Sequence, residues 1–251
     1  MASGEQTPDR FATTRWSVVL TCGDSSANTK DARDALTQLC QTYWRPIFAF
    51  ICHRGYSVPD AQDLTQDFFV KLLEGHLLER ANPNRGRFRS LLLKAVKDFL
   101  NDARDKQHAH KRGGDVNFIR WDEWMAEFPS QFSVSTRNSQ SWSAEKIFDV
   151  RWAATVVERA LHQLADECEQ HGRRRVFDVL SACLGAERED VSYSMYAKTL
   201  GVQESAVKRL VHQLRKRYRQ ILRDEVTHTV ASPDLLDEEL RYLCTVLSTA
   251  Q

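Results

Sequence analysis

The residues with the clearest chemistry in this sequence lie at 193–214, on either side of a glycine. Gly201 follows a helical run, and glycine reaches the left-handed backbone conformation that ends a helix without strain. Ala197, four residues earlier, is small enough to let two helices approach closely. Polar side chains that suit contact with base edges or phosphates follow the glycine: Gln203, Glu204, Ser205, Lys208, Arg209 and His212. This segment predicts a helix-turn-helix that reads DNA.

Apolar residues and further positive charge support this interpretation. Five apolar side chains fall at the spacing that buries one seam between two crossed helices: Tyr196, Leu200, Val202, Val207 and Leu210. Basic side chains that suit a phosphate backbone continue the second helix: Arg215, Lys216, Arg217, Arg219 and Arg223. The alternative is an amphipathic helical hairpin with a solvated basic face, because motifs of this length also match by chance.

The charge of the chain is sorted along its length, although the net charge is only +1. Residues 85–112 carry nine Lys and Arg against three Asp, and residues 203–223 carry seven against one acid. The sign reverses at 60–80, with five acids and two bases, and at 224–251, with six acids and one base. This alternation predicts two surfaces that contact nucleic acid and one that contacts a basic protein partner.

The elements that must position these surfaces are helices. Helical periodicity recurs along the chain and strand signals are nearly absent, so we expect an all-α fold. Besides the helix-turn-helix, the expected helices cover 16–21, 31–54, 60–73, 88–111, 144–170, 173–184 and 233–248. Pro46 is expected to bend its helix, Gly55 to end it, and Ser57 or Asp60 to cap the next one.

Two of the expected helices have clear faces. The helix at 60–73 buries Ala61, Leu64, Phe68, Phe69 and Leu72, and leaves Asp63, Gln66 and Asp67 on the opposite side. The acidic helix at 233–248 has a leucine stripe that needs an apolar partner. We expect it to pack on the helix-turn-helix domain itself, and the alternative is an autoinhibitory lid over the basic recognition helix.

Several classes of function lack a basis in the sequence. The six cysteines include no C-x-x-C pair and indicate reduced, buried thiols, so we expect no metal and no cofactor. Nucleophile-elbow, Walker and H-E-x-x-H motifs are missing, which argues against an enzyme. Residues 1–10 lack the apolar core of a signal peptide and no apolar run is long enough to span a bilayer, so we expect a cytoplasmic protein without membrane contact.

The order of acidic helix, basic helix, linker and basic helix-turn-helix resembles a two-domain sigma factor of RNA polymerase. The similarity is to the extracytoplasmic-function (ECF) class of the sigma-70 family. Residues 60–73, 85–93, 196–209 and 212–219 carry it. Further similarity at 14–16, 148–152 and 230–240 is to the long planctomycete-type variant with a C-terminal extension, and the resemblance covers residues 11–248.

The resemblance implies a division into functional domains. It places a disordered tail at 1–10, a region 2-like domain at 11–112 that binds core polymerase and the −10 element, and a linker at 113–145. A region 4-like helix-turn-helix domain for the −35 element follows at 146–226, and an acidic extension helix at 227–251. The implied partners are promoter DNA, the clamp helices of the largest polymerase subunit, the β-subunit flap, and an anti-sigma factor or other regulator.

The resemblance also implies three sets of site residues. The set that would grip the clamp helices is Asp63, Gln66 and Asp67. The set that would face the melted −10 element is Asn84, Arg85, Arg87, Phe88, Arg89, Lys94 and Lys97. The set that would contact the −35 element is Gln203, Ser205, Lys208, Arg209, His212 and Arg215. Leu91 and Asp98 depart from the family pattern, which commonly has an aromatic residue and an amide there.

Two alternatives to a sigma factor remain open. The chain can be a two-domain helix-turn-helix regulator that acts without polymerase, or a sigma-like protein that binds a partner without initiating transcription. The acidic helix at 60–73 separates the first alternative from a sigma factor, because only a sigma factor needs it to bind core polymerase.

Overall fold

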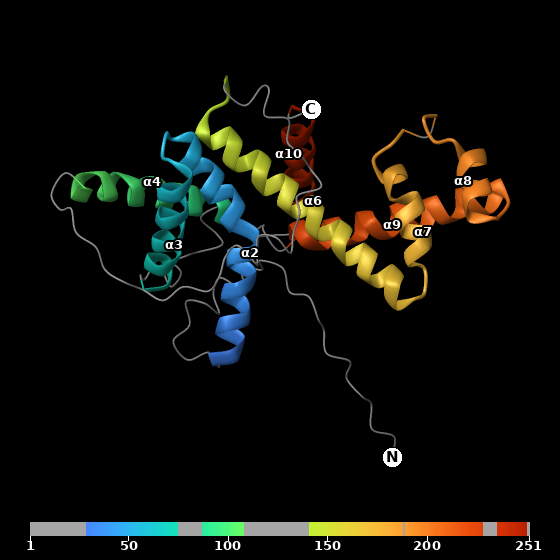
Figure 1. Ribbon diagram of the computed structural model, residues 1–251, viewed down its shortest axis with the longest axis horizontal. Helices are drawn as coiled ribbons and strands as arrows, with labels where there is room; N and C mark the ends of the chain where they lie inside the picture. Colours follow the sequence, from blue (N-terminus) through green and yellow to red (C-terminus); the bar gives the residue numbers. More distant parts are fainter. Residues whose placement is uncertain (1–28, 75–86, 108–140, 188, 228–234, 250–251) are drawn as a thin grey trace, which may run out of the picture. The chain divides into compact units, whose positions relative to one another are not determined.

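Helices account for the regular structure of the part of the chain that can be described. The computed structural model describes residues 29–74, 87–107, 141–187, 189–227 and 235–249 (Figure 1). No strand occurs in these ranges, so the all-α class is confirmed. The elements are α2 (Thr29–His53), α3 (Val58–Glu74), α4 (Phe88–Gln107), α6 (Ala144–Gln170), α7 (Arg174–Leu180), the 3₁₀ helix η3 (Ser181–Leu184), α8 (Tyr193–Leu200), α9 (Glu204–Thr227) and α10 (Leu236–Ser248).

The chain separates into two compact units. Residues 1–154 and 227–251 belong to the first unit, and residues 155–226 form the second. The boundary therefore falls inside α6, whereas the functional division expected from the sequence placed a linker at 113–145. Residues 108–140 of that linker, the tail at 1–10 and the helix expected at 16–21 lie outside the described residues.

Local signals in the sequence set the turn between α2 and α3. Gly55 has a φ of 94°, a left-handed value that glycine adopts at little cost, and its N–H donates to the Cys52 carbonyl. The Ser57 hydroxyl then accepts a bond of 3.3 Å from the Asp60 N–H and donates one of 2.6 Å to the Asp60 carboxylate. This arrangement satisfies a free amide at the start of α3, as the expected cap requires.

The core of the first unit is built by the apolar faces that the periodicity indicates. On α3, all five apolar residues expected to be buried are buried, while Asp63 and Asp67 are exposed and Gln66 is half-buried. Aromatic rings join the helices: Trp44 of α2 stacks on Phe69 of α3 at 6.0 Å, and Phe68 meets Phe99 of α4 edge to face at 5.6 Å.

The C-terminal helix α10 belongs to the first unit, where it lies against α4 and the first part of α6. Its stripe residues Leu236, Leu243 and Val246 are buried. The expectation that this helix packs on the helix-turn-helix domain is therefore wrong.

The second unit contains the expected helix-turn-helix, formed by α8 and α9. Gly201 has a φ of 70°; its N–H reaches the Lys198 carbonyl at 3.3 Å, and the Val202 N–H reaches the Ala197 carbonyl at 3.1 Å. This pair of bonds is a Schellman ending, which only a left-handed residue permits without strain. Ala197 and Val207 are buried in the seam, but Val202 is 40% exposed, so its expected place in the seam is wrong.

Two further expectations concern membranes and thiols. In the ranges that the structure describes, no helix combines the length and the apolar character needed to cross a bilayer. Among the described cysteines, Cys168 and Cys183 are buried, as expected, whereas Cys244 is exposed.

Candidate nucleic-acid and partner-binding surfaces

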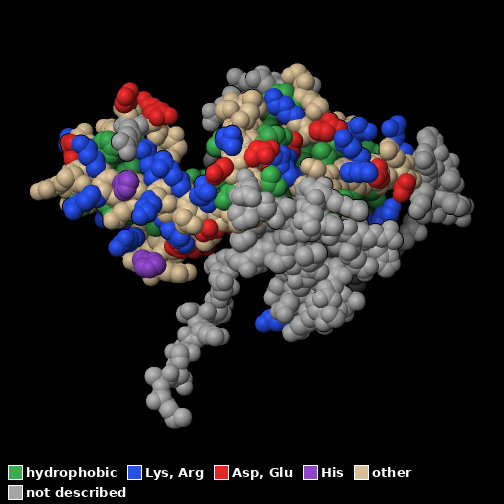
Figure 2. Space-filling view, turned by 180° about the vertical axis from the view of Figure 1, so that it is seen from behind, with side chains coloured by type: hydrophobic (Ala, Val, Ile, Leu, Met, Phe, Trp, Pro, Cys, Tyr) green, Lys and Arg blue, Asp and Glu red, His purple; other side chains and the backbone are tan. Residues whose placement is uncertain are grey.

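The first candidate surface is the exposed side of α9, the helix that follows the Gly201 turn. Five of the six residues expected at the −35 element are exposed: Gln203, Ser205, Lys208, Arg209 and His212. At the left of Figure 2, basic side chains spread over the surface of the second unit. A groove of about 590 Å³ runs along this side of the helix. Lys208, His212, Lys216 and Arg219 line it at spacings of three or four residues, so they share one helical face.

Tyr193 of α8 lies in the same groove, a position that the sequence did not single out. The Lys208 ammonium lies 5.4 Å from the centre of the Tyr193 ring, within cation–π distance. The contact holds the Lys208 side chain near the N-terminal end of α9.

Arg215, the sixth expected −35 residue, is half-buried and bound to the backbone of its own unit. Its Nε and Nη2 donate to the Cys183 carbonyl at 3.0 and 2.7 Å, and Nη2 also donates to the Ala186 carbonyl at 2.6 Å. A guanidinium has five donors, and these bonds occupy the three on Nε and Nη2. Only Nη1 remains, so the main role of Arg215 is to bind η3 and the segment that follows it to α9.

Arg217, on the other side of α9, joins this helix to α6 through an ion pair. Its guanidinium forms a bidentate pair with the Glu167 carboxylate at 2.7 and 2.6 Å. This hydrogen-bonded pair lowers the pKa of the Glu167 carboxyl and raises the pKa of Arg217. Glu225 near the end of α9 differs, because its burial raises its pKa and the nearby Arg159 offsets that rise only in part.

The second candidate surface is the acidic side of α3. Asp63, Gln66, Asp67 and Val70 recur at three- and four-residue spacing, so they share one face. Partial burial raises the pKa of the Asp67 carboxyl, and the neighbouring Asp63 charge adds to this rise. Val70 is 39% exposed on this face, and its apolar contribution was not recognised from the sequence.

The third candidate surface is the start of α4, where the −10 residues were expected. Asn84 and Arg85 lie outside the described residues. Lys94 is exposed, and Lys97 pairs with Glu145 at 2.7 Å, which lowers the pKa of that carboxyl. Asp98 is exposed, and no ion pair joins it to another residue in the described ranges.

Phe88 does not belong to this surface. Its side chain is 2% exposed, and its ring meets Tyr43 of α2 edge to face at 5.5 Å. The expectation that Phe88 faces DNA is corrected by this packing, because a ring at the first position of α4 fills the apolar space between α4 and α2. Leu91 is half-buried on the same helix.

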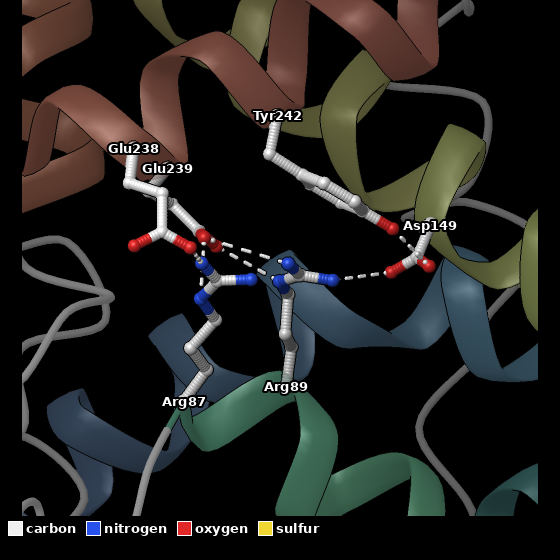
Figure 3. A network of polar contacts seen from close by, with 6 residues as sticks. All are labelled: Arg87, Arg89, Asp149, Glu238, Glu239 and Tyr242. Atoms are coloured by element: carbon white, nitrogen blue, oxygen red, sulfur yellow. Dashed lines mark hydrogen bonds and ion pairs between the residues drawn. The ribbon is translucent and has the colours of Figure 1, made fainter. Parts of the chain in front are cut away.

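Arg87 and Arg89 are bound by carboxylates of α10 and α6 (Figure 3). Arg87 reaches Glu238 through Nη2 at 2.5 Å and Glu239 through Nε at 2.9 Å. Arg89 reaches Glu239 through Nε at 2.8 Å and Asp149 through Nη1 at 2.6 Å. Both arginines were expected to contact −10 DNA, and the structure instead brings them together with the C-terminal helix.

Aromatic rings complete the surroundings of Arg89. Its guanidinium carbon lies 4.9 Å from the centre of the Trp152 ring and 4.2 Å from that of Tyr242, whose hydroxyl donates to Asp149 at 2.6 Å. Burial alone would lower the pKa of Arg89, but its hydrogen bonds and attraction to Glu239 and Asp149 raise it on balance. The guanidinium is therefore a permanently charged centre within the unit.

The acidic run at 237–239 was the signal that could have revealed this network. The sequence showed that the run is acidic, but two basic helices were available as partners and only tertiary packing chose between them. Beside the network, a pocket of about 400 Å³ opens between α4 and Tyr242, and its basic lining comes from Arg87, Arg89, Lys94 and Lys97.

No group of three or more His, Cys, Asp and Glu side chains could hold a metal ion in the described ranges. Comparison of the chain with protein-family models, with curated proteins and with solved structures found no match.

Proposed function

We propose that this chain is a sigma factor that binds core RNA polymerase in the cytoplasm and directs it to promoters, without catalysis or a cofactor of its own. One observation carries the proposal: the same chain joins an exposed acidic face on α3 to a helix-turn-helix whose α9 face is exposed and basic. The resemblance of residues 60–73 and 196–209 to the ECF class supports assigning the acidic face to polymerase and the basic face to promoter DNA.

The acidic face of α3 would bind the clamp helices of the largest polymerase subunit. Asp63 and Asp67 supply charge complementary to a basic partner, and such complementarity steers association and sets the register of an interface. The exposed Val70 on the same face adds an apolar contact to the polar ones.

The exposed face of α9 would read the −35 element in the major groove. Lys208 and Arg209 can donate to guanine acceptors or to phosphates, and Ser205 can bond either kind of base pair. At the −10 element, Lys94 remains an exposed cation on α4. The second unit would also meet the β-subunit flap, as the resemblance implies.

A second function is supported by the network at Arg87 and Arg89. Both arginines were expected at the melted strand, but their charges are paired with carboxylates of α10. This pairing favours a regulator that binds duplex DNA without opening it. Such a regulator would use α9 in the same way but would not need the acidic face of α3.

Reconstitution with core polymerase tests the sigma factor proposal and separates it from this alternative. The full chain should form a stable complex with core enzyme and yield transcripts whose start sites depend on promoter sequence. The double variant Asp63→Lys/Asp67→Lys should lose at least roughly tenfold in core affinity, since close like charges across an interface cost several kcal/mol.

The matched control is Glu189→Lys/Asp190→Lys, which makes the same charge change on two exposed residues of the second unit. It should bind core polymerase like the unmodified chain. A chain that forms no complex with core enzyme, or whose α3 variant binds as well as this control, would contradict the proposal.

A further inference from the structure

The two arginines at the start of α4 are held in different ways. The Arg89 side chain is 7% exposed, lies between two aromatic rings and pairs with Glu239, whose side chain is 0% exposed. The Arg87 side chain is 24% exposed, and that of its partner Glu238 is 60% exposed. Arg89 is thus part of the core, while the pair between Arg87 and Glu238 is open to solvent (Figure 3).

An exposed ion pair contributes only about 0–1 kcal/mol and exchanges readily. If Glu238 releases Arg87, the bond from Nε to the buried Glu239 still orients the guanidinium. Arg87 lines the same pocket as Ser90 and Lys94. Its Nη1 and Nη2 then form a free end of the guanidinium that a phosphate group fits, because a phosphate accepts two parallel N–H bonds as a carboxylate does.

Among the described residues that line this pocket or form ion pairs with its lining, the charges cancel when α10 is in place. Four cations, Arg87, Arg89, Lys94 and Lys97, are matched by four carboxylates, Asp149, Glu145, Glu238 and Glu239. A polyanion therefore meets little net attraction here. Removing the charge of Glu238 alone leaves a surplus of one positive charge beside the exposed Lys94.

We propose that Glu238 is an intramolecular competitor for Arg87, so that α10 sets the affinity of the first unit for the phosphate backbone of single-stranded nucleic acid. Arg89 and Glu239 hold α10 in place, and the pair between Arg87 and Glu238 is the exchangeable contact. The inference rests on the proposed function in one respect, namely that the first unit contacts an opened DNA strand.

Binding of a labelled single-stranded DNA oligonucleotide to the full chain, without polymerase, tests the inference. All proteins carry Lys208→Gln/Arg209→Gln so that binding through α9 is weakened. In this background Glu238→Gln should bind up to roughly fivefold more tightly at low salt, the factor that corresponds to an exposed ion pair. Its salt dependence should steepen by about 0.7 in the log–log slope, the value for one phosphate contact on a single strand.

Two comparisons make the outcome decisive. Glu74→Gln removes the same charge from an exposed residue of the same unit and should leave the affinity unchanged. Adding Arg87→Gln to Glu238→Gln should abolish the gain. Equal affinity of Glu238→Gln and Glu74→Gln, a gain that survives without Arg87, or no binding by any variant would overturn the inference. Because polymerase is not present, failure of this test is distinct from failure of the sigma factor proposal.

Discussion

Arg87 and Arg89 show how far two residues of one type can differ over two positions. Both are basic, Arg87 directly before α4 and Arg89 in its first turn, and both were expected to face DNA. Burial separates them, because Arg89 lies between Trp152 and Tyr242 whereas the Arg87 side chain is 24% exposed. A buried guanidinium needs carboxylates around it, and this need explains why an acidic helix packs at this position.

The buried partner Glu239 should be far more important for stability than its neighbour Glu238. We expect Glu239→Gln to lower the free energy of unfolding by about 3 kcal/mol, because it leaves Arg89 buried with a single carboxylate. Glu238→Gln should cost no more than about 1 kcal/mol, since its pair is exposed. Urea denaturation of the two variants measures both values, and equal losses would show that the network does not depend on burial.

At the scale of elements, the turn between α8 and α9 depends on one backbone conformation. Gly201 has a φ of 70°, and a Cβ added there would meet nothing within 4 Å. Any cost of a side chain at this position therefore comes from the backbone and not from crowding. Gly185 offers the matched case, with a φ of −97° and equally open surroundings.

Gly201→Ala should lower the free energy of unfolding of the second unit by about 1 kcal/mol, the usual cost of a left-handed non-glycine residue. Gly185→Ala should be neutral or slightly stabilising, because it only restricts the unfolded chain. Thermal or urea unfolding of the full chain, followed by circular dichroism, checks the difference. Equal effects of the two substitutions would mean that the turn does not need its left-handed residue.

At the scale of the whole molecule, the first unit is assembled from two distant parts of the chain. Residues up to 154 supply α2, α3, α4 and the start of α6, and α10 returns from the C-terminus to the same unit. The apolar stripe of α10 and the buried Glu239 are built into its interior. A helix that contributes core residues and neutralises a buried arginine is a structural part of that unit.

Deleting residues 227–251 should therefore destabilise the first unit and spare the second. Hydrogen exchange should show loss of protection in α4 and retention in α8 and in α9 up to residue 226. The tryptophan fluorescence, to which Trp152 contributes, should shift towards that of a solvated indole, because Arg89, which lies over the Trp152 ring, loses its contacts with Glu239 and Tyr242. Full protection of α4 in the shortened chain would mean that α10 is dispensable for the fold and serves regulation alone.

The sequence by itself determined the features that depend on neighbouring residues. The all-α class, the faces of α3 and the Gly201 turn were predicted correctly, and the cap of α3 was narrowed to Ser57 or Asp60, of which Ser57 is the one observed. Each follows from contacts three or four residues apart or from the φ of one glycine, and such contacts are encoded locally. The polymerase and promoter assignments came from resemblance and stay predictions.

Only the tertiary structure decided which of the distant surfaces meet. A leucine stripe and an acidic run can pack on either basic helix, and only the fit of side chains placed α10 on α4. The same packing buried Phe88 in the core and left Val202 exposed. It also paired Arg89 with Glu239 and bound Arg215 to the Cys183 carbonyl. Periodicity shows which face of a helix is apolar, but burial of a given side chain depends on the partner that covers it.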